Sequence, residues 1–364
     1  MNASTPRVFI AATRQNDGKT TASLGLIAAL QRHFPRVGYI KPVGQRFVEI
    51  EEQKIDEDTV LMDAVYRLNC PLVDMSPIAV EPAFTRKYLE AANNEALVKR
   101  IQNAFDRVSW EKDFVLCEGS GHAGVGSVFD LSNAQVAKIL GCKVIIVTQG
   151  GIGKPIDEVC LNRALFEKEG VEVIGVIINK VLEAKIPEIT QFVRRGLRRK
   201  NLELLGVLPH EQILCNPTVD LIRAELRAEL LNAPRTSHAL VDNVVVGAMG
   251  AHNAMKFFKP GVLLITPGDR EDIVLAACAA IDAQSEAKMA GIVLTGGLRP
   301  AENILAIIRA MPIPVLLAQD DSYQVASRVH NLTVKTQPDD AEKISLIRDI
   351  VARHVNVKKI IDSL

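Results

Sequence analysis

The chain has 364 residues and a mass of 39.7 kDa, which is too long for one ordinary core and predicts two or three domains. Apolar residues make up 48% of it and aromatic residues only 4%, so we expect a Val-, Ile-, Leu- and Ala-rich core, as in sheets covered by helices. Basic and acidic residues number 43 each, so the chain has no net charge that would attract nucleic acid or an anionic membrane. The basic run Arg194–Lys200 is a local exception, either a solvated helix end or an anion site.

The six cysteines lie far apart, with no CxxC pair and no Cys/His spacing typical of a metal site. Their apolar surroundings predict small buried side chains in a reducing compartment. No signal peptide is expected before the first strand, and no apolar run approaches the roughly 18 residues of a spanning helix. We therefore expect a cytoplasmic protein without a nucleic-acid or membrane partner.

Short β-branched runs alternate with helical stretches through the first two thirds of the chain. The predicted strands are Val8–Ala11, Val37–Ile40, Phe114–Cys117, Val144–Val147, Val173–Ile178 and Leu204–Val207. Helical periodicity lies between several of them, as in Ala22–Gln31 and Leu161–Glu169. This alternation predicts an α/β fold with a mostly parallel sheet and right-handed crossovers.

A charged helical segment, Leu221–Leu231, leads into the polar, Pro-containing stretch Asn232–Val241, where we place the domain boundary. A smaller α/β unit is predicted beyond it. Its strands are Val244–Val246, Val262–Ile265, Gly291–Leu294 and Val315–Leu317, with helices at Ile273–Ala283 and Ala301–Ala310. The predicted domains are therefore 1–232 and 240–355.

The segment Ala12–Thr21, ATRQNDGKTT, lies between a predicted strand and an amphipathic helix and has the pattern of a phosphate-binding loop. Gly18 allows close backbone approach, Lys19 supplies charge for the outer phosphates, and Thr20 offers a hydroxyl to magnesium. The residues expected around the nucleotide are Asn16, Asp17, Gly18, Lys19, Thr20 and Thr21. An ordinary strand–turn–helix corner is the alternative, but the context favours a P-loop domain that binds ATP with Mg²⁺.

A second acidic position supports this site. Phe114–Gly121 is a predicted buried strand that ends in Glu118 and a small-residue loop. An acid at the carboxyl end of a neighbouring strand is where a ligand of magnesium or of a water belongs. Because glutamate is common at strand ends, Glu118 is informative only together with the phosphate loop.

The sequence resembles dethiobiotin synthetases and cobyrinate amidating synthetases from residue 7 to about 215, and it shares their P-loop, which is one residue longer than the common pattern. The matching segments are Lys41-Pro42-Val43, Asp58, Glu81-Pro82, Glu118–His122, Gly175–Asn179 and Gly206–Pro209. The resemblance implies that Lys19, Lys41 and Glu118 are catalytic, that Thr20, Asp58 and Glu118 hold magnesium, and that Asn179 faces the adenine. Two lysines and two acids at strand ends suit phosphoryl transfer to an oxygen anion.

Each of these positions also has a structural alternative. Lys41 could be a surface lysine, Asp58 could cap a helix within the acidic run Asp56-Glu57-Asp58, and Asn179 could form a strand exit. The departures from the synthetase pattern are Ala12 for glycine, the large Gln45-Arg46 pair, and His122 for glycine. The departures after Lys41 and Glu118 fall on the side of the site where the phosphoryl acceptor would bind, and the ATP side is nearly intact. We therefore expect ATP binding but not the biotin-precursor reaction.

Asp269-Arg270 and Thr295-Gly296-Gly297, preceded by Val246–Met249, resemble the DRTGG domain, which typically follows such a P-loop domain at the front of long phosphotransacetylases. The transacetylase catalytic domain would need further chain after Leu364, so acetyl transfer is not expected. Cys278 lies in a helical run, so glutamine-dependent ammonia delivery is not expected either. The Asp269-Arg270 pair is expected to bridge protomers or bind a small anion, or else to fix two loops through an internal ion pair.

The leading hypothesis is an ATP-binding regulatory or sensor protein whose second domain mediates assembly or ligand sensing. It predicts a homo-oligomer and, as partner, an enzyme of acetate or acetyl-phosphate metabolism. An ATP-dependent ligase or kinase that activates a carboxylate is the alternative. An interaction module without ATP turnover is a third possibility, which the retained Gly18-Lys19-Thr20 argues against.

Overall fold

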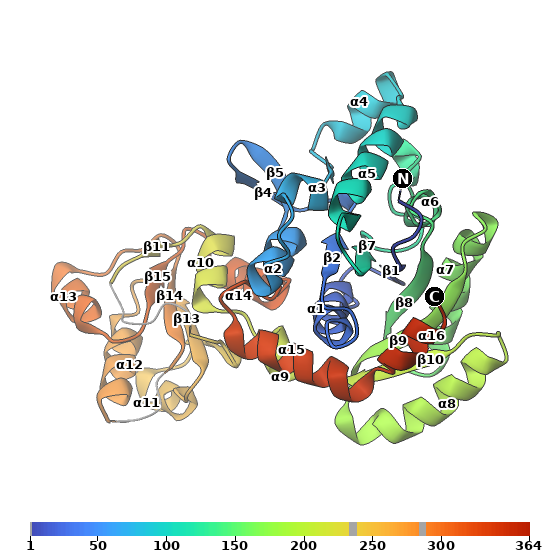
Figure 1. Cartoon of the computed structure of the whole chain (residues 1–364). Helices are drawn as coiled ribbons and strands as arrows, with labels where there is room; N and C mark the ends of the chain where they lie inside the picture. Colours follow the sequence, from blue (N-terminus) through green and yellow to red (C-terminus); the bar gives the residue numbers. More distant parts are fainter. Residues whose placement is uncertain (1, 233–238, 284–288) are drawn as a thin grey trace. The chain divides into compact units, whose positions relative to one another are not determined.

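The computed structural model describes residues 2–232, 239–283 and 289–364, and Figure 1 shows it as a ribbon. Two compact units make up the chain. One comprises Met1–Glu211 with Thr336–Leu364, and the other comprises Gln212–Lys335. The domain limits expected from sequence, 1–232 and 240–355, differ from these units mainly because the chain after Lys335 returns to the first unit. Most of the predicted linker, 233–238, lies outside the described residues.

Six parallel strands form the main sheet of the first unit, in the order β10-β9-β8-β1-β7-β2. The strands are β1 (Arg7–Ala12), β2 (Val37–Ile40), β7 (Phe114–Glu118), β8 (Lys143–Gln149), β9 (Val173–Val181) and β10 (Leu204–Pro209). Nearly all of their residues are buried, as expected for a parallel sheet covered on both faces. The predicted parallel α/β fold is confirmed, and each of the six strands predicted in this region corresponds to one strand of this sheet.

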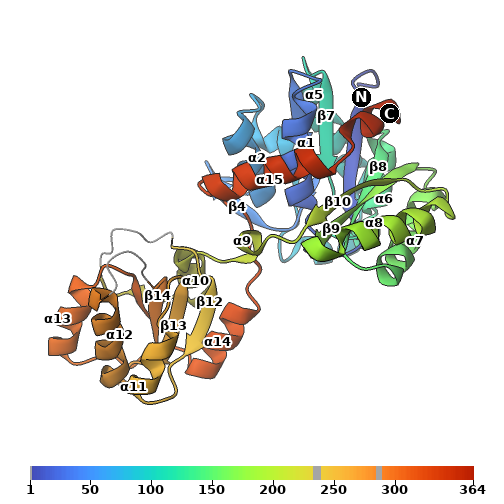
Figure 2. The same ribbon diagram turned by 90° about the horizontal axis from the view of Figure 1, so that it is seen from below.

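Helices cover both faces of this sheet. The helices of this unit are α1 (Lys19–Leu30), α2 (Glu57–Tyr66), α3 (Leu72–Met75), α4 (Phe84–Glu90), α5 (Asn94–Ser109), α6 (Asn133–Ile139), α7 (Gly153–Lys168), α8 (Ile186–Arg198), α15 (Ala341–His354) and α16 (Val357–Asp362). Short 3₁₀ turns lie at Ser127–Phe129 and Glu183–Lys185. Helix α15 lies along α1 (Figure 2). Most residues of α1 are buried because α1 packs against both the sheet and α15.

Between β2 and α5 the chain forms elements that the sequence did not predict. Two short strands, β3 (Val43–Gly44) and β6 (Ile78–Ala79), pair in parallel. A hairpin of β4 (Phe47–Ile50) and β5 (Gln53–Asp56) runs directly into α2. This hairpin therefore brings the end of β5 back to the region where β2 ends.

The second unit is a smaller α/β layer in the strand order β11-β15-β14-β13-β12. Its strands are β11 (Glu229–Leu230), β12 (Asn243–Val246), β13 (Val262–Pro267), β14 (Gly291–Thr295) and β15 (Val315–Leu317). Its helices are α9 (Gln212–Cys215), α10 (Val219–Leu226), α11 (Ala251–Ala254), α12 (Glu271–Ala283), α13 (Glu302–Ala310) and α14 (Ser322–His330), with a 3₁₀ turn at Met255–Phe257. The four strands predicted beyond residue 240 correspond to β12–β15.

One predicted helix of this unit is partly wrong. The helical segment expected at Leu221–Leu231 ends at Leu226, and Glu229–Leu230 instead pairs antiparallel with β15. Arg227, with φ 51°, leaves the helix in the left-handed conformation and so ends it. Among the described residues of the whole chain, no helix has the length and apolar character that crossing a bilayer requires.

Candidate functional site

The loop between β1 and α1 is held in shape by an aspartate within it. Asp17 Oδ2 accepts hydrogen bonds of 2.7 Å from both Thr13 Oγ1 and the backbone N–H of Arg14. Gly18 precedes α1 with φ 96°, and a side chain there would collide with the amide of Asn179, so only glycine suits this position. Because the first N–H groups of a helix have no partner within it, the start of α1 can receive an anion.

The strand end at Asn179 supports this loop from the neighbouring side. Asn179 Nδ2 donates to the backbone oxygen of Asp17 at 2.9 Å, and Lys180 Nζ donates to that of Asn16 at 2.9 Å. The structure therefore places Asn179 against the phosphate loop. The adenine contact that the resemblance implies for Asn179 remains a prediction.

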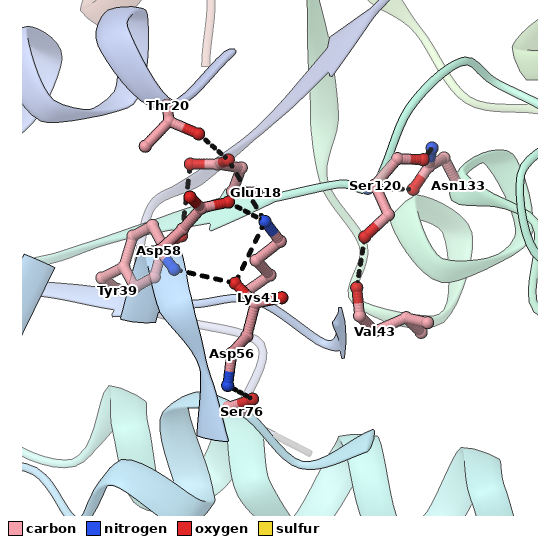
Figure 3. A network of polar contacts seen from close by, with 10 residues as sticks. All are labelled: Thr20, Tyr39, Lys41, Val43, Asp56, Asp58, Ser76, Glu118, Ser120 and Asn133. Carbon is pink, nitrogen blue, oxygen red and sulfur yellow. Dashed lines mark hydrogen bonds and ion pairs between the residues drawn. The ribbon is translucent and has the colours of Figure 1, made fainter. Parts of the chain in front are cut away.

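Three residues singled out from the sequence, Lys41, Asp58 and Glu118, meet in one buried network (Figure 3). Lys41 Nζ forms an ion pair with Asp58 and lies 3.7 Å from Glu118 Oε1. Lys41 follows β2, Asp58 lies in the first turn of α2, and Glu118 ends β7. Since β2 and β7 are adjacent parallel strands, their carboxyl ends bring the lysine and the glutamate together.

Glu118 connects this network to the phosphate loop. Thr20 Oγ1, in the first turn of α1, donates to Glu118 Oε1 at 3.0 Å, and Tyr39 OH donates to Oε2 at 3.2 Å. Both carboxylate oxygens are thus fixed within a fully buried side chain. Sequence reasoning missed Tyr39, although alternate residues along an extended segment share a face and Tyr39 stands two positions before Lys41.

Asp56 is a second residue that the sequence analysis did not single out. Its Oδ1 lies 3.2 Å from Lys41 Nζ and also accepts the backbone N–H of Asp58 at 2.9 Å. Asp56 is thus the N-cap of α2, the role considered for Asp58. A side chain at Gly44 would come within 2.6 Å of Asp56 Oδ2, so the small residue after Lys41-Pro42-Val43 makes room for this carboxylate.

Burial and charge shift the pKa values of this network in different directions. Burial raises the pKa of Glu118 and lowers that of Lys19 to about 8. Burial by itself would also lower the pKa of Lys41, but Asp58, Asp56 and Glu118 together raise it above its ordinary value. Lys41 is therefore a permanent cation, whereas Lys19 can lose its proton in mildly alkaline solution.

The loop after Glu118 is anchored away from the charged network. Ser120 Oγ donates to the backbone oxygen of Val43, and Asn133 Oδ1 accepts the Ser120 N–H at 3.0 Å (Figure 3). His122, which replaces a glycine of the synthetase pattern, is exposed. Glu81 of the Glu-Pro pair is also largely exposed and forms an ion pair with Lys54 at 2.7 Å, so the described network does not include it.

The donor set fits a magnesium ion that binds together with a nucleotide. Thr20, Asp58 and Glu118 offer a hydroxyl and two carboxylates, and hard oxygen donors are the ligands that Mg²⁺ prefers. Among the described residues, no group of three or more His, Cys, Asp and Glu side chains is arranged to hold a metal ion. A magnesium ion on these residues would take phosphate or water oxygens as its further ligands.

In the second unit, two residues of the DRTGG pattern, Arg270 and Thr295, form polar contacts within the unit. Arg270 donates to both carboxylate oxygens of Asp272, at 2.8 and 3.0 Å, and to the backbone oxygen of Met249 at 3.1 Å. Thr295 Oγ1 and Ser322 Oγ are 2.7 Å apart. Arg270 pairs with Asp272, two positions away at the start of α12, rather than with the exposed Asp269, and its bond to Met249 links this loop to the one after β12. The bridging of protomers and the binding of an anion remain predictions.

Comparison with protein families agrees with this arrangement. The family described as AAA domain matches residues 6–218, which is more than half of the chain. The chain belongs to this AAA-domain family. A second family, described as DRTGG domain, matches residues 221–332. The order of domains inferred from the two sets of motifs, a P-loop domain followed by a DRTGG domain, is confirmed.

Curated relatives include the phosphate acetyltransferases of Nitratidesulfovibrio vulgaris and Pseudomonas aeruginosa. Each relative is 29% identical to this chain, and the match covers 96% of this chain and 50% of the relative. The chain thus spans about half the length of the curated relatives it matches. The predicted relationship to phosphotransacetylases is confirmed at this level.

Solved structures give only distant likenesses. The MinC:MinD cell division complex of Aquifex aeolicus aligns with a TM-score of 0.36 and 16% identity, over 57% of this chain and 83% of that one. The CBS and DRTGG domains of the Clostridium perfringens pyrophosphatase regulatory region, complexed with the activator diadenosine tetraphosphate, align with a TM-score of 0.27 and 20% identity, over 50% and 86%. Because both TM-scores are below 0.5, the fold assignment rests on the strand order described above.

Proposed function

We propose that this chain is an ATP-binding regulatory or sensor protein that acts with an enzyme of acetate or acetyl-phosphate metabolism. The observation that carries the proposal is the hydrogen bond from Thr20 of the phosphate loop to Glu118, which joins that loop to a buried network of acids and a lysine. A P-loop beside a fixed carboxylate suits a nucleotide bound with a divalent cation. We place the protein in the cytoplasm as a homo-oligomer, with the second unit responsible for assembly or ligand sensing.

In this proposal each residue of the site has one task. The N–H groups at the start of α1 bind phosphate oxygens, and Lys19 neutralises the outer phosphates. Thr20, Asp58 and Glu118 hold Mg²⁺, which supplies charge neutralisation when bound. Asn179 and Asp17 keep the loop in its binding shape through the hydrogen bonds described above.

Regulation rather than turnover is favoured by the acceptor side of the site. The ammonium group of Lys41 is surrounded by Asp56, Asp58 and Glu118, so an anionic acceptor would have to displace at least one of these carboxylates to reach it. The inserted second unit is joined to the first at both of its ends. Both features suit a protein that responds to a nucleotide more than one that processes a second substrate.

A carboxylate-activating ligase or kinase is the second candidate. The observation in its favour is that Lys41 lies 3.7 Å from Glu118, whose carboxylate also accepts the Thr20 hydroxyl. An acceptor oxygen bound by Lys41 would therefore be close to the outer phosphate. Release of ADP that depends on an added carboxylate metabolite would favour this candidate over the regulator.

The test is calorimetric titration with ATP and Mg²⁺, combined with thermal melting and sedimentation. Wild-type protein is expected to bind, and saturation at about 100 times Kd should stabilise it by about 2.7 kcal/mol. Lys19→Ala should weaken binding at least tenfold, because the charge-assisted bonds to phosphate are lost. Lys138→Ala, which changes an exposed lysine paired with Glu169, is the matched control and should bind normally. The proposal is refuted if ATP changes neither the melting temperature nor the oligomeric state of the wild type.

A further inference from the structure

The buried network contains one acid more than magnesium and phosphate binding require. Asp58 and Glu118 are the proposed magnesium ligands, whereas Asp56 belongs to neither the phosphate loop nor the segments that match the synthetases. Yet Asp56 is 1% exposed, and its Oδ1 lies 3.2 Å from the Lys41 ammonium. Space for its carboxylate exists only because Gly44 has no side chain. A buried carboxylate kept at this position calls for a reason beyond its role in capping α2.

The charges of the site suggest that reason. Its buried ammonium groups are Lys19 and Lys41, and its buried carboxylates are Asp17, Asp56, Asp58 and Glu118, which together have a net charge of −2 when all are ionised. A site with this balance repels the phosphates of free ATP. A divalent cation held by Asp58 and Glu118 would bring this balance to zero and would take two of the three counter-ions of Lys41. Asp56 is then the carboxylate that still holds the lysine in place.

We propose that Asp56 is a positioning residue that holds Lys41 through the exchange of counter-ions and makes ATP binding depend on a divalent cation. Without a cation, Lys41 bridges Asp56, Asp58 and Glu118. Were Asp58 and Glu118 to hold Mg²⁺, Asp56 would keep Lys41 in place and leave its remaining donors available to the outer phosphate. The preference of the chain for the magnesium complex over free ATP is therefore about as large as the effect of the Asp56 charge on nucleotide affinity. This inference rests on the proposed ATP site.

The decisive variant is Asp56→Asn. Asparagine caps a helix as well as aspartate does, so the bond from the Asp58 N–H to Oδ1 is kept while the charge is removed. A unit charge a few ångströms beyond the lysine, at an effective dielectric constant of about 20, changes the affinity for a nearby phosphate by about tenfold. We expect Asp56→Asn to bind free ATP in EDTA about tenfold more tightly than wild type. Its affinity in excess Mg²⁺ should change less, so the ratio of the two Kd values should shrink.

Matched variants separate this role from a structural one. Asp56→Ala loses both cap and charge, and should melt at a lower temperature than Asp56→Asn. Asp58→Asn removes a proposed magnesium ligand, so it should lose affinity in excess Mg²⁺ instead of only gaining affinity in EDTA. In a Lys41→Met background, the effect of Asp56→Asn on the ratio should fall markedly, because the residue on which Asp56 acts is absent.

Calorimetric titration of ATP in Mg²⁺ and in EDTA distinguishes the outcomes. If Asp56→Asn changes both affinities by the same factor, Asp56 is only a helix cap and the inference is wrong. If the effect is unchanged in the Lys41→Met background, Asp56 does not act through Lys41 and the inference is also wrong. If wild-type protein binds ATP in neither condition, the proposed ATP site itself has failed, which is a different result from the other two.

Discussion

Replacing Gly25 with alanine tests a close packing contact between two helices of the first unit. Gly25 lies in α1, and a Cβ atom there would be 2.3 Å from Val351 Cγ2, 2.5 Å from Val351 Cβ and 3.0 Å from the backbone oxygen of Ile347. Val351 and Ile347 belong to α15 and are buried. Alanine at position 25 must therefore push α15 away from the helix that begins at the phosphate loop.

The expected magnitude follows from two opposing effects. Overpacking a close contact costs about 1–3 kcal/mol. Replacing glycine by alanine inside a helix returns about 1 kcal/mol through backbone entropy. Because one of the clashing atoms is backbone oxygen and another is a Cβ, the neighbour has little freedom to move, and we expect a net loss of about 1–2 kcal/mol in the free energy of unfolding.

Urea denaturation followed by far-UV circular dichroism and by Trp110 fluorescence measures this loss. Trp110 is the single tryptophan and lies in the first unit, so its signal reports that unit. Val351→Ala alone should cost about 1.5 kcal/mol from two lost methyl groups. The double variant should lose about 1 kcal/mol less unfolding free energy than the two single variants added together, because removing Val351 Cγ2 relieves the nearest clash.

A matched glycine provides the control. Gly153 begins α7, and a Cβ there would meet no atom within 4 Å. Gly153→Ala is therefore expected to be neutral or slightly stabilising. If Gly25→Ala behaves in the same way, the contact between α15 and α1 is wrong, and with it the assignment of residues after Lys335 to the first unit.

Three further predictions concern charge. The pKa of Lys19 is lowered to about 8, so ATP affinity in Mg²⁺ should fall as the pH rises above that value, and Lys19→Arg should remove this dependence in calorimetric titrations. In the unfolded chain the pKa returns to 10.5, so the contribution of Lys19 to the stability of the nucleotide-free protein should rise between pH 8 and 10.5, as urea titrations would reveal. Arg270→Ala should destabilise the second unit by about 1 kcal/mol, discounted for partial exposure, while Asp269→Ala changes the melting curve less; equal effects would contradict the internal role of Arg270.

The sequence alone determined the elements whose signal is local. The six strands of the main sheet appear as short β-branched runs because a parallel strand is buried on both faces and must be apolar throughout. The phosphate loop is equally local, since its function needs a glycine, a lysine and a hydroxyl in succession between a strand and a helix. Glu118 could be placed near that loop because strand ends of a parallel sheet share one edge, whereas Lys41 was placed there through the resemblance to dethiobiotin synthetases.

Tertiary structure alone decided the features that depend on distant pairs. Asp56 stands in an acidic run that predicts only a helix start, and its contact with Lys41 exists because the β4–β5 hairpin brings the chain back. The helical run at Leu221–Leu231 extended the prediction past Arg227, where the pairing of Glu229–Leu230 with β15 overrides local helical preference. The return of α15 to α1 likewise has no local signal, because the space beside Gly25 is defined only once a segment more than 300 positions away has packed there.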